Sequence, residues 1–297
     1  MAPRLFTSLT RGALRGARRE AASGTARRAA ARAHAVVVLP GFLRGAALYG
    51  ELPAALRRRG HERVEVAQVE AWQWYPTLAG RDFAWYLQAV ERACEAALRG
   101  AAPEARVVLV GHSAGGWLAR AFLVTEAYCG VRFGELPAAQ RVAAVVTLGT
   151  PHINLEDYPL GRAVEQRSNE RDDMPPDAQG SSLAFVNLYA PSPAEDARVA
   201  YRTVAGTGVV GAESPLAAVL EGQGGQGAFT AFSYRAALGR SAGVDGDGVT
   251  PLECAGLHGA PMLELDDVRH LPAPGAVWYG DAVGVSRWAH LLDEISV

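Results

Sequence analysis

The segment Arg106–Gly116, with the sequence RVVLVGHSAGG, constrains the fold of this 297-residue chain more than any other. An apolar run at Val107–Val110 leads into GHSAG, and a helical pattern follows over Gly116–Tyr128. This order predicts a strand, a sharp turn with Ser113 at its apex, and then a helix. Such a turn strains the serine backbone and brings neighbouring backbone so close that only glycine fits beside it. Ser113 is therefore a candidate nucleophile.

Apolar runs alternate with helical patterns along most of the chain. The runs predict strands at residues 34–39, 63–69, 142–148, 199–204 and 261–265, and the helical spacings predict helices at 46–58, 82–99, 183–189 and 286–295. This alternation predicts an α/β fold whose mostly parallel central sheet is covered by helices on both faces. The polar stretch within residues 152–197 is expected to form a small cap or lid. The glycine-rich stretch at 206–227 is expected to be irregular and mobile, and the aromatic stretch at 72–76 is expected to form a loop.

The N-terminal segment differs in composition from the rest of the chain. The first 35 residues hold eight arginines and a single acid, Glu20. The composition of residues 1–33 is typical of an organellar transit peptide. It predicts a chloroplast location, and a mitochondrial or cytoplasmic location is the alternative. The catalytic domain is expected at 34–297. No apolar run is long enough to predict a transmembrane segment.

Charge and cysteine content exclude several classes of function. Beyond residue 35 the chain has 21 arginines against 30 acids, and this acidic balance argues against nucleic-acid binding. The three cysteines, Cys94, Cys129 and Cys254, follow no metal-binding spacing and are expected to be reduced thiols. No cofactor or metal is expected.

A serine hydroxyl needs a base, and His270 is placed to be that base. The base is usually a histidine, itself oriented by a carboxylate. In sheets with a serine at such a turn, the chain order is serine, acid, histidine, each after a strand. His270 follows the strand predicted at 261–265 by a short loop, and His258 is the second choice.

The acid is expected in the sequence GDGVTP at residues 246–251. Asp247 lies there between two glycines, and Asp245, two residues earlier, remains an alternative. A calcium loop is disfavoured because Val249 and Gly256 occupy positions that would need oxygen ligands.

Backbone N–H groups must stabilise the negative charge that develops on the attacked carbonyl oxygen. One is expected from Ala114, the residue after the nucleophile. The other is expected from Phe42, in the loop PGFL that follows the first central strand.

Five motifs together resemble a known family. They are PGF at 40–42, GHSAGGWLAR at 111–120, LGTPH at 148–152, GDGVTP at 246–251 and WYG at 278–280. The chain, over roughly residues 35–295, resembles the lipase-like α/β-hydrolases of plant and algal chloroplasts and cyanobacteria. The resemblance implies an α/β-hydrolase fold, a triad of Ser113, Asp247 and His270, and hydrolysis of esters or lipids.

The sequence thus predicts a serine ester hydrolase that works through an acyl-enzyme. Acyl transfer to an alcohol from the same acyl-enzyme, and ligand binding without catalysis, are the alternatives. The expected partner is a small ester or a lipid, the latter with peripheral membrane contact. Five aromatic residues could wall an acyl pocket, but most of them are expected to pack in the core or to cover the sheet: Trp72, Trp74, Tyr75, Trp85 and Tyr86.

Overall fold

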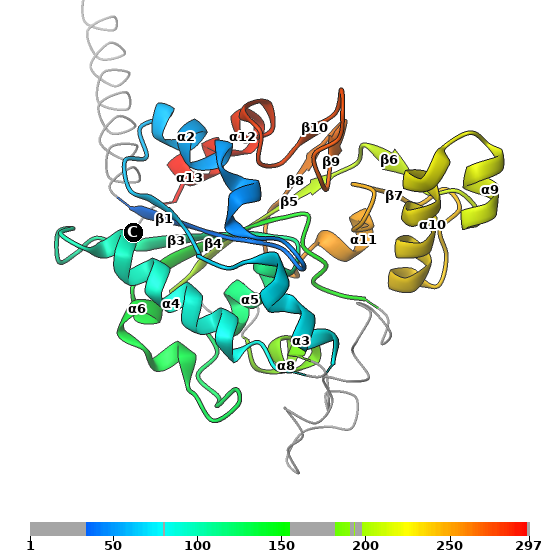
Figure 1. Ribbon diagram of the computed structural model, residues 1–297. Coiled ribbons are helices and arrows are strands. Elements are labelled where there is room, and N and C mark those ends of the chain that lie inside the picture. The colour runs from blue at the N-terminus through cyan, green and yellow to red at the C-terminus, as the bar shows by residue number, and fades with distance from the viewer. Residues whose placement is uncertain (1–33, 80, 155–181, 191–192, 194–197, 296–297) are drawn as a thin grey trace, which may run out of the picture.

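A parallel β-sheet of six strands forms the centre of the molecule. The computed structural model describes residues 34–79, 81–154, 182–190, 193 and 198–295. Every neighbouring pair in this sheet is parallel, in the order β2-β1-β3-β4-β5-β8 (Figure 1). The strands are β1 (Ala35–Leu39), β2 (Val64–Val66), β3 (Val107–His112), β4 (Val142–Leu148), β5 (Ala200–Gly206) and β8 (Met262–Leu265).

Two hydrophobic cores lie on opposite faces of this sheet. Side chains alternate along β1, so Ala35, Val37 and Leu39 enter one core and Val36 and Val38 enter the other. All five are fully buried. A strand buried on both faces must be apolar at every position, which explains the uninterrupted apolar runs in the sequence.

Helices cover both faces of the sheet (Figure 1). The first core lies under α4 (Ala84–Leu98), α5 (Ala114–Ala121), α6 (Pro137–Gln140) and α8 (Ser182–Tyr189). The second lies under α2 (Glu51–Arg58), α12 (Ala282–Trp288) and α13 (His290–Asp293). The remaining short helices are η1 (Ala46–Tyr49), η2 (Ala71–Trp74), α3 (Tyr75–Leu78), η3 (Phe133–Glu135) and α11 (Leu252–Ala255).

A helical pair extends from the β8 side of the sheet. It consists of α9 (Pro215–Leu220) and α10 (Gly224–Leu238), and it follows the two-residue strand β6 (Val209–Val210) (Figure 1). β6 pairs antiparallel with β7 (Asp245–Gly246), while β9 (Val268–Arg269) pairs with β10 (Val277–Trp278). The structure differs here from the expected irregular stretch at 206–227. Glycines lower helix propensity, but Ser214 caps α9 through a hydrogen bond from the N–H of Ala217.

Two further segments differ from their expected form. The helix after the serine turn ends at Ala121 rather than near Tyr128. Beyond it, the N–H groups of Leu123 and Val124 bond to carbonyls three residues back, and the carbonyl of Val124 accepts the N–H of Gly134. The aromatic segment at 72–76 is helical, in η2 and α3, rather than a loop. None of the described helices combines the length and apolar character needed to cross a bilayer.

The domain boundaries remain predictions. Residues 1–33 and most of the expected cap at 152–197 lie outside the described residues. Within that cap range, α8 packs against α5 in the helix layer.

Candidate active site

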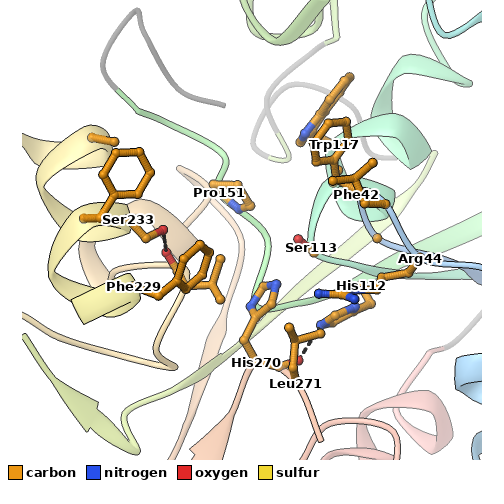
Figure 2. A pocket seen from close by; sticks show the side chains of 16 residues that line it. Phe42, Arg44, His112, Ser113, Trp117, Pro151, Phe229, Ser233, His270 and Leu271 are labelled. Atoms are coloured by element: carbon orange, nitrogen blue, oxygen red, sulfur yellow. Dashed lines mark hydrogen bonds between the residues drawn. The ribbon is translucent and has the colours of Figure 1, made fainter. Parts of the chain in front are cut away.

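A pocket of about 220 Å³ lies at the carboxyl edge of the central sheet. Figure 2 shows Ser113 and His270 between two walls. Phe42, Arg44, His112 and Trp117 form one wall, and Phe229 and Ser233 of α10 lie opposite. Its other lining residues are Gly41, Leu43, Ala114, Pro151, Phe232, Ala236, Val249 and Leu271. Loops after several parallel strands meet at this edge, which is where open α/β sheets bind ligands.

Ser113 occupies the strained turn between β3 and α5. Its φ of 54° and ψ of −129° lie outside the regions that L-residues prefer. A Cβ on Gly111 would come 2.5 Å from the carbonyl oxygen of Gly115, and one on Gly115 would clash with the carbonyl of Leu39. The two glycines are therefore required by close backbone contact, and the turn places Ser113 at the pocket.

Asp247 and His270 form a buried pair beside this serine. His270 Nδ1 lies 2.7 Å from Asp247 Oδ2, and the N–H of His270 donates to the carbonyl of Asp247 at 2.8 Å. His270 is 4% exposed and Asp247 is 2% exposed. Asp245 is exposed on β7 and His258 is exposed on a loop, and neither lines the pocket. The structure thus brings together Asp247 and His270 rather than their alternatives.

Further hydrogen bonds hold Asp247 as a carboxylate acceptor. Its Oδ1 accepts the N–H groups of Val249 and Thr250 at 3.0 and 2.7 Å. Its Oδ2 accepts the hydroxyl of Tyr279 at 2.9 Å. Burial, and then the charge of Asp247, raise the pKa of Tyr279, so this hydroxyl keeps the proton that it donates. Tyr279 belongs to the WYG motif, which the sequence alone linked to no role.

The expected hydrogen bond from Ser113 Oγ to His270 is absent from the described structure, although both residues line the same pocket. Hydrogen bonds between a nucleophile and its base are often long without substrate and shorten in the complex. The geometry therefore leaves the catalytic role of the serine as a prediction.

The two residues expected to supply oxyanion donors, Phe42 and Ala114, also line the pocket. Within the described residues, neither backbone N–H donates a hydrogen bond to the protein. Ala114 is the first residue of α5, where backbone N–H groups have no partner inside the helix. Both N–H groups are thus free for a ligand oxygen.

A chain of hydrogen bonds joins the loop of Phe42 to the loop of His270. The N–H of Gly41 donates to Tyr49 Oη at 2.8 Å, and Tyr49 Oη lies 2.7 Å from His112 Nδ1. His112 Nε2 lies 3.0 Å from the carbonyl oxygen of His270. Burial lowers the pKa of His112 well below its usual value, so the ring is neutral. In that form Tyr49 donates to Nδ1, and Nε2–H donates to His270.

Apolar side chains make up most of the pocket surface, and several were not expected there. Trp117 follows the serine turn, while Phe229 and Phe232 come from α10. The aromatic residues considered from the sequence lie elsewhere: Trp74 and Tyr86 are buried in the core, and Trp72 and Tyr75 are exposed. The i, i+3 spacing of Phe229 and Phe232 was the one available sign of this wall.

Other chemistry-bearing residues lie apart from the pocket. Cys94 and Cys254 are buried free thiols, and Cys129 is partly buried. No group of three or more His, Cys, Asp or Glu side chains within the described ranges is arranged to hold a metal ion.

Sheet order, helix layers and a serine turn at the carboxyl edge of the sheet together define the α/β-hydrolase fold, which confirms the expected fold class. Residues 81–157 match the family described as the PGAP1-like alpha/beta domain. A search of curated protein sequences finds no match to the chain.

Several solved structures are similar to this chain at low sequence identity. A metagenomic carboxyl esterase superposes with a TM-score of 0.54 at 16% identity, covering 88% of this chain and 76% of the other. A carbohydrate esterase from gut microbiota has a TM-score of 0.45 at 12% identity, covering 88% and 84%. Esterase 2 of Thermogutta terrifontis has a TM-score of 0.43 at 13% identity, covering 88% and 82%. The metagenomic esterase supports a shared fold. The resemblance to chloroplast and cyanobacterial proteins remains a prediction.

Proposed function

We propose that this protein is a serine ester hydrolase whose triad is Ser113, His270 and Asp247. One observation carries the proposal: a histidine bonded to a buried carboxylate lines the same pocket as a serine held on a strained turn. The similarity in fold to a carboxyl esterase is consistent with it.

The reaction follows from the positions of these groups. Ser113 Oγ attacks the ester carbonyl carbon while its proton passes to His270 Nε2. Asp247, bonded to Nδ1, keeps the other ring nitrogen free to accept that proton and stabilises the imidazolium. The N–H groups of Phe42 and Ala114 bind the oxyanion.

The attack produces a tetrahedral intermediate, and its collapse forms the acyl-enzyme. The leaving alkoxide takes the proton from His270 and departs as the alcohol. Water then attacks the acyl-enzyme with His270 again as base, which releases the acid and restores Ser113.

A hydrolysis panel tests this function. Neutral esters with acyl chains of two to twelve carbons should be hydrolysed by the wild type, and Ser113→Ala should lower kcat by roughly 10⁴-fold or more. Ser286→Ala, at an exposed serine on α12, is the matched control and should keep full activity. Equal rates for Ser113→Ala and the wild type would overturn the proposal.

The same assay separates two alternatives. Acyl transfer predicts that an added alcohol diverts product from the free acid to a new ester, and simple ligand binding predicts tight binding with no turnover. Both alternatives use the same pocket, and the bond between Asp247 and His270, which readies a histidine as a base, favours turnover.

We also propose that residues 1–33 direct the protein to an organelle, most naturally the chloroplast. Their arginine-rich, acid-poor composition supports this. A fluorescent protein carrying these 33 residues should enter plastids, and retention in the cytosol would contradict the assignment.

A further inference from the structure

Arg44 is the one permanently charged side chain among the described residues that line the pocket. It belongs to the loop after β1 that also carries Phe42, and it is half-buried. Figure 2 shows it on the same wall as His112. A positive charge therefore lines the same pocket as the proposed nucleophile.

Among the described residues, the guanidinium of Arg44 forms no hydrogen bond or ion pair. Its backbone is held at both ends: the N–H donates to the carbonyl of Gly41, and the carbonyl accepts Trp74 Nε1–H, each at 3.0 Å. No aspartate or glutamate in the described part of the chain lines the pocket. Arg44 thus presents an unpaired positive charge at the pocket, for which a bound anion would be the counter-ion.

The charge of Arg44 also acts on the neighbouring wall. Burial is the main cause of the lowered pKa of His112, and the positive charge of Arg44 acts in the same direction. Arg44 thus adds to the electrostatic field of the site that contains His112 and Ser113.

The rest of the pocket surface is mainly apolar. Phe42, Trp117, Phe229, Phe232 and Leu271 supply hydrocarbon and aromatic surface around the serine. Such a surface stabilises an apolar part of a ligand, while Arg44 suits an oxyanion that accepts two parallel N–H bonds. A ligand that fits both the apolar surface and Arg44 is an amphiphile with a negatively charged group.

We propose that Arg44 forms an anion subsite and that the preferred substrate is an ester with an apolar chain and a carboxylate or phosphate group. This inference rests on the proposed ester hydrolysis. Arg44 selects the substrate by binding the anion and orienting the ester carbonyl toward Ser113, while the apolar walls hold the chain.

Matched esters test the subsite. The substrates are 4-nitrophenyl hexanoate and its analogues with a terminal carboxylate or a terminal phosphate, and the readout is the kcat/KM ratio of each charged ester to the neutral one. In the wild type a charge-assisted contact should raise at least one ratio by about 10- to 100-fold. Whether the carboxylate or the phosphate ester shows the larger ratio identifies the source of the anion.

Variants assign the preference to Arg44. Arg44→Gln should remove it, mainly through KM of the charged esters, and Arg44→Lys should retain part of it because the charge remains but the planar fork does not. Arg58→Gln, at an exposed arginine on α2, is the matched control and should leave the ratios unchanged. If the kcat/KM ratio of charged to neutral ester is the same in the wild type and in Arg44→Gln, the inference is overturned.

A binding measurement separates failure of this inference from failure of the proposed function. Calorimetry with hexyl phosphate, hexanoate and hexanol requires no turnover. The wild type should bind an anion at least about 10-fold more tightly than hexanol, and Arg44→Gln should not. If no ester is hydrolysed but this difference holds, ester hydrolysis is wrong and the anion subsite stands. If esters are hydrolysed and the difference is absent, only the subsite is wrong.

Discussion

Asp247 is distinguished from Asp245 by its surroundings rather than by its sequence. Both lie in a glycine-rich turn, but Asp247 is buried and accepts four hydrogen bonds, from Val249, Thr250, His270 and Tyr279. A carboxylate so held fixes the tautomer of the histidine. Asp245 is exposed and lacks these contacts.

Exchange of each aspartate for asparagine tests this difference. Asp247→Asn should lower kcat for ester hydrolysis by about 10⁴-fold, because the amide no longer holds His270 in its productive tautomer. Asp245→Asn is the matched control, two residues away, and should have little effect. The assignment fails if the Asp245 variant loses more activity than the Asp247 variant.

At the scale of elements, close contact between β1 and α5 explains the serine turn. Gly115 packs against the Leu39 carbonyl at the end of β1, and Gly111 packs against the first turn of α5. The strain at Ser113 persists because strand and helix are both held by packing on the sheet.

Gly115→Ala should therefore disrupt this junction. Its new Cβ overlaps backbone that cannot move alone, so the free energy of unfolding should fall by about 3 kcal/mol or more. Gly225→Ala in α10 is the control: its Cβ meets open space, and alanine should stabilise the helix by up to about 1 kcal/mol. Urea unfolding measures both, and equal stability of the Gly115 variant and the wild type would contradict the packing account.

Local patterns in the sequence predict the parts of the site that depend on a few adjacent residues. The serine turn and the parallel sheet follow from short motifs and apolar runs. The hydrogen bonds from Tyr49 to His112 and from Tyr279 to Asp247 join residues 63 and 32 positions apart, and no local pattern carries that information. The α10 wall was missed because its glycine-rich start has low helix propensity.

At the scale of the whole molecule, buried histidines make stability depend on pH. Burial lowers the pKa of His112 and of His152 well below the usual 6.5. Below pH 6.5 the unfolded chain therefore binds protons that the folded protein excludes, and the free energy of unfolding falls as the pH falls.

Urea unfolding at pH 7.5 and pH 5.5 should show this loss. Each histidine contributes a slope of up to about 1.4 kcal/mol per pH unit below its ordinary pKa. His152→Gln should reduce the pH dependence, whereas His290→Gln, at an exposed position on α13, should not. Stability that is constant or higher at pH 5.5 would contradict the account.

The central claim is that Ser113 is the nucleophile of this α/β-hydrolase fold. The most direct measurement is to treat the protein with a fluorophosphonate, digest it, and locate the added mass on the peptides. The account predicts a single phosphonylated residue, Ser113, with labelling lost in His270→Gln and retained in Ser286→Ala. Absence of labelling, or labelling of another residue, would contradict it.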